Sequence, residues 1–562
     1  MAARRVSKDP APGTADVSPL VGLVNELERL RADLVAREAE LAGVLNELPA
    51  ATRASARNLV HYVSLRRHDL RELQDRLAEL GLSSLGRAEA HVLNNVNTVL
   101  ALLARSAGLE APDVPMAPLA AAAGRSLLEA RTRALLGPKP AKRSVRIMVT
   151  MSSEAASDPA LVHDLVAGGM DCMRINCAHD DAEAWAAMIG HLKDARQKTG
   201  RACRVLMDIA GPKLRTGAVE PGPGVVKWRP RRDSLGRVTA PARVWLTPEM
   251  VREAPPSPAD ACLPLPGEWL ARLEVGAELR LRDAREAKRR LLVVERSGQS
   301  LWAESHETAY VATGAELKLK GTGNDATSST ARVGDLAPLE QTLLLRPGDT
   351  LWLEREAVPG RPALLDGGGR VLEPARISCT LPEVFADLKP GQPVWFDDGR
   401  IGGVVRHATR DRVEIEVRLA RAEGEKLGAD KGINLPESTL RLGALTAKDA
   451  SDLEFVARHA DLVGFSFVRT ADDVRTLQER LAKLGGERLG VVLKIETRHG
   501  FDNLPALLLA AMKSPAAGVM IARGDLAVEC GTSAWPRYRR RSCGCPRPRT
   551  CRSSGRRRCS RA

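Results

Sequence analysis

Two short apolar runs that flank a helical segment dominate the stretch from Val491 to Glu529. The runs, Val491–Leu493 and Gly518–Ile521, have the length and composition of buried parallel strands, and residues 503–512 between them have helical character. In a chain of repeating βα units, charged residues just past the strand ends collect at the face of a (β/α)₈ barrel that carries the chemistry. Here they are Lys494, Glu496, Arg523 and Asp525, with Gly524 in the turn that opens the next helix.

This set of side chains has two interpretations. One cation, two carboxylates and a glycine at a helix start suit an anionic substrate held with a metal ion. Salt bridges at the strand ends, without a functional role, explain this stretch alone equally well. The remainder of the chain decides between them.

The same alternation of strand and helix occurs elsewhere. Strand-like runs begin at Val145, Asp171, Ala202 and Asp461, and helical segments cover residues 159–167, 181–198 and 447–459. With the two runs above this gives six strands, so we predict an α/β fold, a (β/α)₈ TIM-type barrel of which six strands are present. Between residues 218 and 431, Pro and Gly turns separate short strand-like runs, which predicts an inserted, β-barrel-like lid domain.

The expected organisation has six parts. Residues 1–18 form a disordered leader, and residues 19–136, whose leucines keep a helical period, form a helical extension. The barrel occupies residues 144–217 and 432–530 on either side of the inserted β-domain, 218–431. Residues 531–562 form an aberrant Arg- and Cys-rich tail with no apolar period. A DNA-reading role for the extension is conceivable, but its charges alternate in sign, which favours a solvated bundle or a partner-docking arm.

Charge and cysteine content limit the partners and the cellular compartment that we expect. The net charge is +14, but residues 532–562 alone carry eleven Arg and no acidic residue, so the rest carries 14 − 11 = +3. Aromatic residues make up only 3% of the chain, so we do not expect a nucleic-acid partner. Ten cysteines without regular spacing predict reduced thiols in a cytoplasm, and no apolar run is long enough to cross a membrane.

Six motifs, in order, resemble those of pyruvate kinases. They are MRINCAHD, LMDIAGPKLRTG, WFDDGRI, KGINLP, FSFVRTADDV, and KIET followed by ARGDLAVE, and they lie within about residues 145–217 and 392–529. Metal-dependent C–C lyases of the phosphoenolpyruvate/pyruvate barrel superfamily share only two of them. The resemblance implies transfer of the phosphoryl group of phosphoenolpyruvate to ADP, giving pyruvate and ATP in glycolysis.

The resemblance also implies residue roles. Lys494 and Arg174 match the catalytic, phosphoryl-binding cations, and Gly524 and Asp525 with Arg174 match the substrate site. Glu496 and Asp525 match the carboxylates that hold Mg²⁺ (or Mn²⁺), an ion that prefers oxygen ligands. The residues that match positions near the nucleotide phosphates are Asn176, His179 and Arg215.

The monovalent-cation site of the family is altered in this sequence. The matching positions are Asn176, Ala178, Asp208 and Ile209, of which Ala178 offers no side-chain ligand and Ile209 only its carbonyl. Lys213 stands where potassium-dependent members carry Glu. Its ammonium is the expected substitute for K⁺, so we expect that K⁺ is not required.

The chain departs from the family after Cys530. The resemblance implies a seventh and an eighth strand, a substrate-contacting threonine and a C-terminal domain in a homotetramer, and none of these is recognisable. We therefore expect impaired phosphoryl transfer by this chain, and a frameshift near Gly531 as the origin of the tail. A lyase, or a non-catalytic remnant in which only the helical extension acts, are the alternatives.

Overall fold

The structure is a computed structural model that describes residues 18–83, 85–110, 113, 115–320, 329–438 and 440–531. It separates into two compact units, and each is described by itself. The first unit comprises Met1–Leu214, Ala386–Gly399 and Ile433–Ala562, as far as these are described. The second comprises Arg215–Phe385 and Arg400–Gly432. The predicted tail after Gly531 and most of the predicted leader lie outside the described residues.

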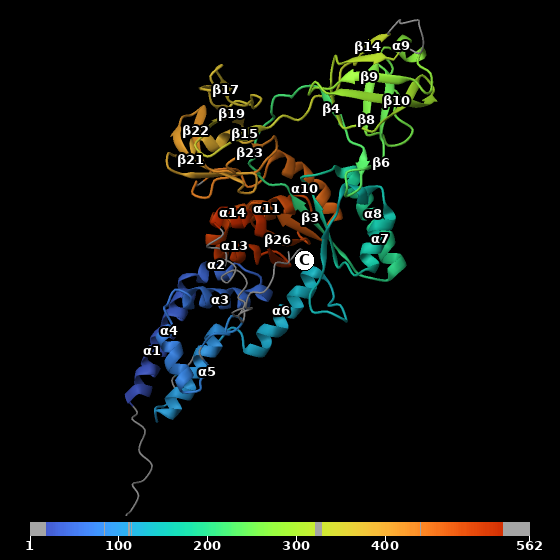
Figure 1. Cartoon of the computed structure of the whole chain (residues 1–562). Coiled ribbons are helices and arrows are strands. Elements are labelled where there is room, and N and C mark those ends of the chain that lie inside the picture. The colour runs from blue at the N-terminus through green and yellow to red at the C-terminus, as the bar shows by residue number, and fades with distance from the viewer. Residues whose placement is uncertain are drawn as a thin grey trace, which may run out of the picture. The chain divides into compact units, whose positions relative to one another are not determined.

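A six-stranded parallel sheet forms the centre of the first unit and curls into a half-barrel (Figure 1). Its order, β1-β2-β3-β25-β26-β27, follows the chain, as in a barrel. The six strands predicted from the sequence are thereby confirmed. Their bounds are β1 (Met148–Thr150), β2 (Cys172–Asn176), β3 (Arg204–Ile209), β25 (Leu462–Phe465), β26 (Gly490–Ile495) and β27 (Ala517–Ile521).

Helices cover the outer face of this sheet. Alternate strand residues such as Met207, Val463 and Leu493 face outward and pack with the helices in one buried core. The intervening residues face inward, where Leu206, Leu462 and Val492 form a second, smaller cluster. The covering helices are α7 (Pro159–Ala167), α8 (Ala182–Thr199), α10 (Ala447–His459), α11 (Ala471–Lys483), α12 (Arg498–Asp502), α13 (Leu504–Ala511) and α14 (Arg523–Cys530).

The predicted helical extension consists of amphipathic helices with a leucine- and valine-rich core. An apolar period over residues 85–103 predicts a helix that begins at Leu85 with Ser84 as its cap. The helix begins at Val92 instead, because Leu85 packs into the core from the loop before it. The proposed cap Ser84 lies outside the described residues. The helices are α1 (Ser18–Glu40), α2 (Ala42–Asn46), α3 (Ala50–Leu65), α4 (Arg71–Glu79), α5 (Val92–Ser106) and α6 (Ala121–Leu136).

The last helix of the extension, α6, reaches the inner face of the half-barrel. Leu135 near its C-terminus belongs to the apolar cluster of Leu206, Leu462 and Val492. A Cβ atom added at Gly518 would lie 2.5 Å from the side chain of Leu135, so the glycine leaves the space that the leucine fills. The extension therefore contributes to the interior of the barrel.

The second unit is built of β-strands, as predicted for the insertion. One sheet of seven strands, in the order β14-β13-β9-β10-β11-β7-β8, is nearly closed into a barrel (Figure 1). Its strands are β7 (Ala242–Pro248), β8 (Ala261–Leu265), β9 (Glu278–Arg282), β10 (Lys288–Ser297), β11 (Ser300–Ser305), β13 (Glu316–Leu319) and β14 (Thr330–Arg332). Smaller sheets pair β4 (Val225–Trp228) with β12 (Ala309–Ala312), and β5 (Arg231–Arg232) with β6 (Val238–Ala240).

The remaining strands of the second unit form a separate sheet and two short two-stranded sheets, β15-β23 and β17-β18. The sheet contains the run β19-β16-β22-β21. The strands are β15 (Leu343–Leu345), β16 (Thr350–Glu354), β17 (Leu364–Leu365), β18 (Val371–Glu373), β19 (Ala375–Ser378), β21 (Ile401–Ala408), β22 (Arg412–Leu419) and β23 (Glu425–Leu427). In the first unit, β20 (Pro393–Phe396) pairs with β24 (Ile433–Asn434).

Three segments of similar sequence, which could indicate a duplicated unit, contain tight glycine turns that lead into strands: LEVGAELRLRD from Leu273, LLRPGDTLWLE from Leu344 and DLKPGQPVWFDDG from Asp387. Gly276, Gly348 and Gly391 have φ angles of +94°, +94° and +89°, in the left-handed region that favours glycine. They precede β9, β16 and β20, and β9 and β16 lie in different sheets. The shared turn explains the similarity without requiring a duplicated unit.

Among the residues described, no helix is both long and apolar enough to cross a lipid bilayer.

Candidate active site

Charged side chains from adjacent strands meet on the inner face of the half-barrel, at the C-terminal ends of the strands. Asp208 near the end of β3 is fully buried and accepts a hydrogen bond from Nε of Arg174 at 2.7 Å. A terminal nitrogen of Arg174 forms an ion pair with the same oxygen at 2.5 Å. The ammonium of Lys494 on β26 lies 3.4 Å from the same carboxylate oxygen. One carboxylate thus holds both cations that the sequence assigned to the phosphoryl group.

Lys494 also joins the cluster to Glu496 and Ser466. Its ammonium lies 3.0 Å from Oε1 of Glu496 and donates to Oγ of Ser466 at 2.7 Å. The other carboxylate oxygen of Glu496 accepts the backbone N–H of Phe467 at 2.7 Å. Lys494 and Glu496 are 7% and 4% exposed, so both are held rigidly in a low-dielectric setting where their charges act strongly.

Burial raises the pKa of Glu496, and the negative charge of Asp525 raises it further, while Lys494 opposes both effects. A cation between the two carboxylates would relieve this repulsion. Mg²⁺ is commonly held by one or two carboxylates together with substrate oxygens. The two residues therefore fit such an ion, although no group of three or more His, Cys, Asp or Glu side chains suited to a metal occurs among the described residues.

Two backbone features place these groups so close together. Gly464 on β25 faces Asp208, and a Cβ atom there would lie 1.9 Å from Oδ1 of the aspartate. Phe467, just after the same strand, has a φ of +54°, a strained value for a residue with a side chain. In this conformation the N–H of Phe467 donates to Glu496. Strained backbone of this kind is often found at functional sites.

Asp525 and Gly524 lie in the first turn of α14, which follows β27. Gly524 is exposed, and no heavy atom lies within 4 Å of where its Cβ would be. The free N–H groups of a helix start attract an anion such as a carboxylate. The structure therefore has the helix start that the sequence predicted at Gly524 and Asp525.

The residues predicted to bind the nucleotide and the monovalent cation are more dispersed. Asn176 ends β2 beside Asp208 in the sheet register, and its side-chain oxygen accepts the N–H of Ala178 at 3.3 Å. His179 is exposed in the following loop, where its carbonyl accepts from Trp185 at 3.0 Å. Ile209 has its side chain in the outer core.

Two further predicted residues lie after β3. Lys213 is half-buried in the segment that leads out of the first unit. Arg215 begins the second unit and pairs there with Asp430, at 2.5 Å. The structure brings together Arg174, Asp208, Lys494 and Glu496. Lys213 and Arg215 have other contacts, among them Gly211 for the first and Asp430 for the second.

The hydroxyl groups of Thr150 and Ser466 and the linking role of Asp208 were not predicted from the sequence. Thr150 at the end of β1 accepts a hydrogen bond from Arg174 at 2.8 Å, and Ser466 accepts from Lys494. Both follow apolar strands, so the strand-end rule that found the charges would also have found them. Asp208 was assigned to a cation site only, whereas it links the two phosphoryl-binding cations.

Comparison with known proteins supports the same interpretation. The chain matches the family model "Pyruvate kinase, barrel domain" over residues 142–231 and 369–541. The gap between the two stretches contains the seven-stranded sheet, and the match runs past Gly531 into the predicted tail.

Pyruvate kinases of several bacteria are similar to the matched part. The enzymes of Clostridium acetobutylicum and Clostridium perfringens are each 34% identical over 155 residues, 27% of this chain and 31% of theirs. The enzyme of Mycobacterium tuberculosis is 32% identical over 244 residues, 42% of this chain and 47% of its own. The chain thus spans less than half the length of each of these relatives.

Proposed function

Because the chain belongs to the pyruvate kinase family through its barrel domain, we propose that its site transfers the phosphoryl group of phosphoenolpyruvate to ADP, giving pyruvate and ATP in glycolysis. The observation that carries this proposal is the cluster of Arg174, Asp208, Lys494 and Glu496 on the inner face of the sheet. The relatives named above are pyruvate kinases, which favours phosphoryl transfer over carbon–carbon cleavage.

Phosphoryl transfer depends mainly on positioning and on stabilising negative charge. Arg174 and Lys494 are fixed by Asp208, so their positive charges need little reorganisation when a phosphoryl group arrives. Lys494 is the proposed partner of the transferring group, and Arg174 of the remaining phosphate oxygens. The hydroxyl groups of Ser466 and Thr150 accept further hydrogen bonds from Lys494 and Arg174.

Glu496 and Asp525 are the proposed ligands of Mg²⁺ or Mn²⁺. When bound, the ion would supply positive charge to the phosphoryl and carboxylate oxygens of the substrate. The N–H groups of Gly524 and Asp525 are proposed to bind the substrate carboxylate. Asn176, His179 and Arg215 are the proposed contacts to the nucleotide.

A cytoplasmic location accompanies this proposal. The six cysteines among the described residues are all free thiols, as expected in a reducing compartment. No nucleic acid or membrane takes part in the proposed reaction.

The open edges of the sheet bear on the turnover that we expect of the 562-residue chain by itself. In the described residues the sheet has β1 and β27 as its edges, whereas a closed (β/α)₈ barrel has none. If nothing else completes the sheet, we expect turnover well below that of a relative with eight strands.

The test combines binding and turnover. Calorimetry should show Mg²⁺-dependent binding of phosphoenolpyruvate that Lys494→Met and Glu496→Gln abolish, and a coupled assay with ADP should detect slow pyruvate formation. The matched controls are Lys483→Met and Glu479→Gln, whose side chains lie on α11 outside the cluster. Mg²⁺-independent binding, or unchanged binding by the Lys494 variant, would refute the assignment, and cleavage of a 2-keto acid instead would support the lyase.

A further inference from the structure

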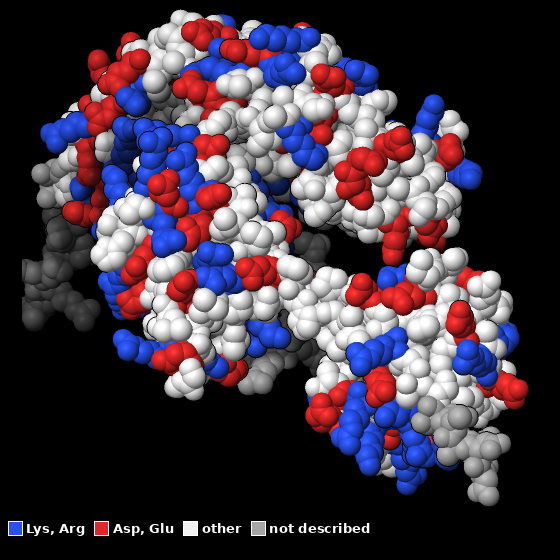
Figure 2. All heavy atoms as spheres, turned by 90° about the horizontal axis from the view of Figure 1, so that it is seen from above, with Lys and Arg blue, Asp and Glu red and all other residues white. Residues whose placement is uncertain are grey.

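The seven-stranded sheet of the second unit carries a concentration of positive charge that the proposed reaction does not use. Charges of both signs mix over most of the surface in Figure 2, but Lys and Arg gather densely in places. The sheet also lies in the part of the chain that the family match omits. We propose that its outer face binds a compact anion with two or more phosphate groups.

The positive charge follows from strict alternation on four neighbouring strands. Inward positions such as Leu279, Leu281 and Leu291 are buried and apolar. Seven cations and two carboxylates stand at outward positions of these strands or just past their ends, beside the uncharged Leu292 and Thr330; Glu295 lies beyond the bulge in β10. The cations are Arg280, Arg282, Lys288, Arg290, Lys318, Lys320 and Arg332, and the carboxylates are Glu278 and Glu316.

The strand register places like charges directly opposite each other. Arg280 on β9 faces Arg290 on β10 on one side and Lys318 on β13 on the other. Arg282 likewise faces Lys288. Directly opposed like charges destabilise a sheet, and among the described residues only Arg280 and Lys318 in this row of three cations have a carboxylate beside them. An anionic ligand would offset the remaining repulsion.

The available carboxylates neutralise only part of the face. Glu278 accepts from Arg280 at 2.8 Å and from Lys320 at 3.0 Å. Glu316 lies 3.4 Å from Lys318, and Glu286 lies 3.8 Å from Arg282. Within the described residues, the side chains of Lys288 and Arg290 have no hydrogen bond or ion pair. Only the backbone of Arg290 is engaged, since its N–H donates to Glu307 and its carbonyl accepts from Ser305. These two cations are therefore open to a ligand.

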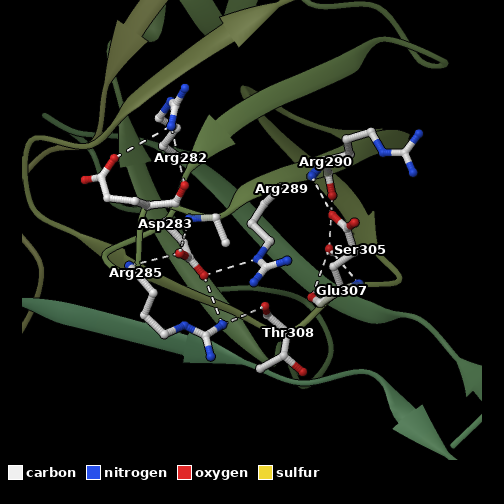
Figure 3. Close-up of polar contacts among 10 residues, drawn as sticks. Arg282, Asp283, Arg285, Arg289, Arg290, Ser305, Glu307 and Thr308 are labelled. Atoms are coloured by element: carbon white, nitrogen blue, oxygen red, sulfur yellow. Dashed lines mark hydrogen bonds and ion pairs between the residues drawn. The ribbon is translucent and has the colours of Figure 1, made fainter.

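A buried aspartate fixes the hairpin that presents these cations (Figure 3). Asp283 accepts the N–H groups of Arg285 and Ala287 at 2.9 and 3.1 Å, and Nε of Arg289 at 3.1 Å. Hydrogen bonds from Arg285, Ala287 and Arg289 outweigh its burial and lower its pKa to about 2. The β9–β10 hairpin is thus a rigid support at the pH of the cell.

The shape and composition of the face favour a small ligand over a nucleic acid. A hollow of about 650 Å³, within the range of small-molecule sites, is lined by Arg280, Arg282, Lys288, Arg289, Arg290 and Lys318 together with three glutamates. The outward strand positions hold no aromatic ring on which a base could stack. Guanidinium groups bind phosphate through two parallel hydrogen bonds, which suits a compact polyphosphate.

The test is calorimetric titration of the full chain with tripolyphosphate. Arg280→Thr with Arg290→Thr should weaken binding roughly tenfold or more, since charged hydrogen bonds are lost. The matched control, Arg237→Thr with Arg272→Thr, removes equal charge from exposed positions of the same unit that lie off the four strands and should bind as the wild type. Each titration is repeated with Lys494→Met added to the wild type and to both double variants. This removes any binding of tripolyphosphate at the barrel cluster from the measured signal.

Folding and competition complete the experiment. The Arg280/Arg290 variant should unfold at the same or a higher temperature, because like-charge repulsion is removed, and Arg290→Lys should weaken binding less than Arg290→Thr. Equal loss in both double variants would show a general charge effect and overturn the proposal. Absence of binding by the wild type, or binding of an oligonucleotide that tripolyphosphate fails to displace, would also overturn it.

Discussion

At the scale of single residues, the site depends on one buried aspartate and the glycine beside it. Asp208 orients Arg174 and Lys494, and Gly464 leaves the space that its carboxylate occupies. The residue types and their strand-end positions were predictable from the sequence. Their mutual contacts were not, because Asp208 and Lys494 are far apart in the chain and meet only through the sheet register.

Glu496 should make metal binding depend on pH. Its folded-state pKa is raised by burial, so it keeps its proton to a higher pH than an exposed glutamate would. The stability that accompanies its protonated form is present below the ordinary pKa and is lost as pH rises through the folded one. Conversely, Mn²⁺ affinity should fall as pH falls through the folded pKa, measured by calorimetry.

The Glu496→Gln variant should bind Mn²⁺ weakly at every pH in this range, because the titrating ligand is gone. Glu479→Gln on α11 serves as the control and should keep the pH dependence of the wild type. The same pH dependence in both variants would show that another group titrates.

Lys213 should make the enzyme independent of potassium. An ammonium at this position would supply the positive charge that the resemblance assigns to K⁺, and Ala178 has no side-chain oxygen that could bind the ion. Activity of a full-length relative with the same motif should therefore be unchanged between Na⁺ and K⁺ buffers in a coupled assay. Strong activation by K⁺ would contradict this role.

At the scale of elements, helix starts hold the loops that carry the site. The side chain of Asp449 in α10 accepts Thr446 N–H at 2.8 Å within a capping box, and also Gly211 N–H at 3.0 Å in the loop after β3. Gly211 has a φ of +69° and packs against Ser466 and Phe467, so the cap supports both loops that border the site.

Asp449→Ala should destabilise the fold by about 2 to 4 kcal/mol, since it removes a cap and leaves buried N–H groups without an acceptor. Denaturant unfolding measures this. Asp472→Ala on α11, whose side chain is exposed, should change stability by less than about 0.5 kcal/mol. Equal effects of the two substitutions would show that the cap contributes nothing.

The extent of successful prediction differs between elements for a physical reason. The six parallel strands and helices such as α7 and α10 were predictable, because apolar period and caps determine them locally. The start of α5 was not, since Leu85 is buried by tertiary packing from a loop. The division of the insertion into separate sheets also escaped prediction, because strand pairing joins residues distant in the chain.

At the scale of the whole molecule, the helical extension takes part in the barrel unit and is not merely attached to it. Leu135 fills the inner face beneath the charged cluster, and Lys513 of the barrel pairs with Glu47 of the extension at 2.9 Å. The amphipathic helices were predictable from the sequence, but the surface against which they pack was not, because an apolar stripe does not identify the surface that covers it.

Leu135→Ala should lower the free energy of unfolding by about 2 to 4 kcal/mol, through lost burial and the cavity left behind. Leu128→Ala on the same helix is the control, since Leu128 is 67% exposed, and it should change stability by less than about 0.5 kcal/mol. A similar small effect at both positions would show that α6 is not part of the core.

The central claim is that Glu496 and Asp525 form a divalent-metal site facing Lys494 on the inner face of the half-barrel. Electron paramagnetic resonance with Mn²⁺ tests it directly by counting bound ions in the full chain. We expect one site in the wild type, in the presence of phosphoenolpyruvate, and none in the Glu496→Gln/Asp525→Asn variant, while a Glu479→Gln/Asp472→Asn control keeps it. Undiminished Mn²⁺ binding by the Glu496/Asp525 variant would contradict the account.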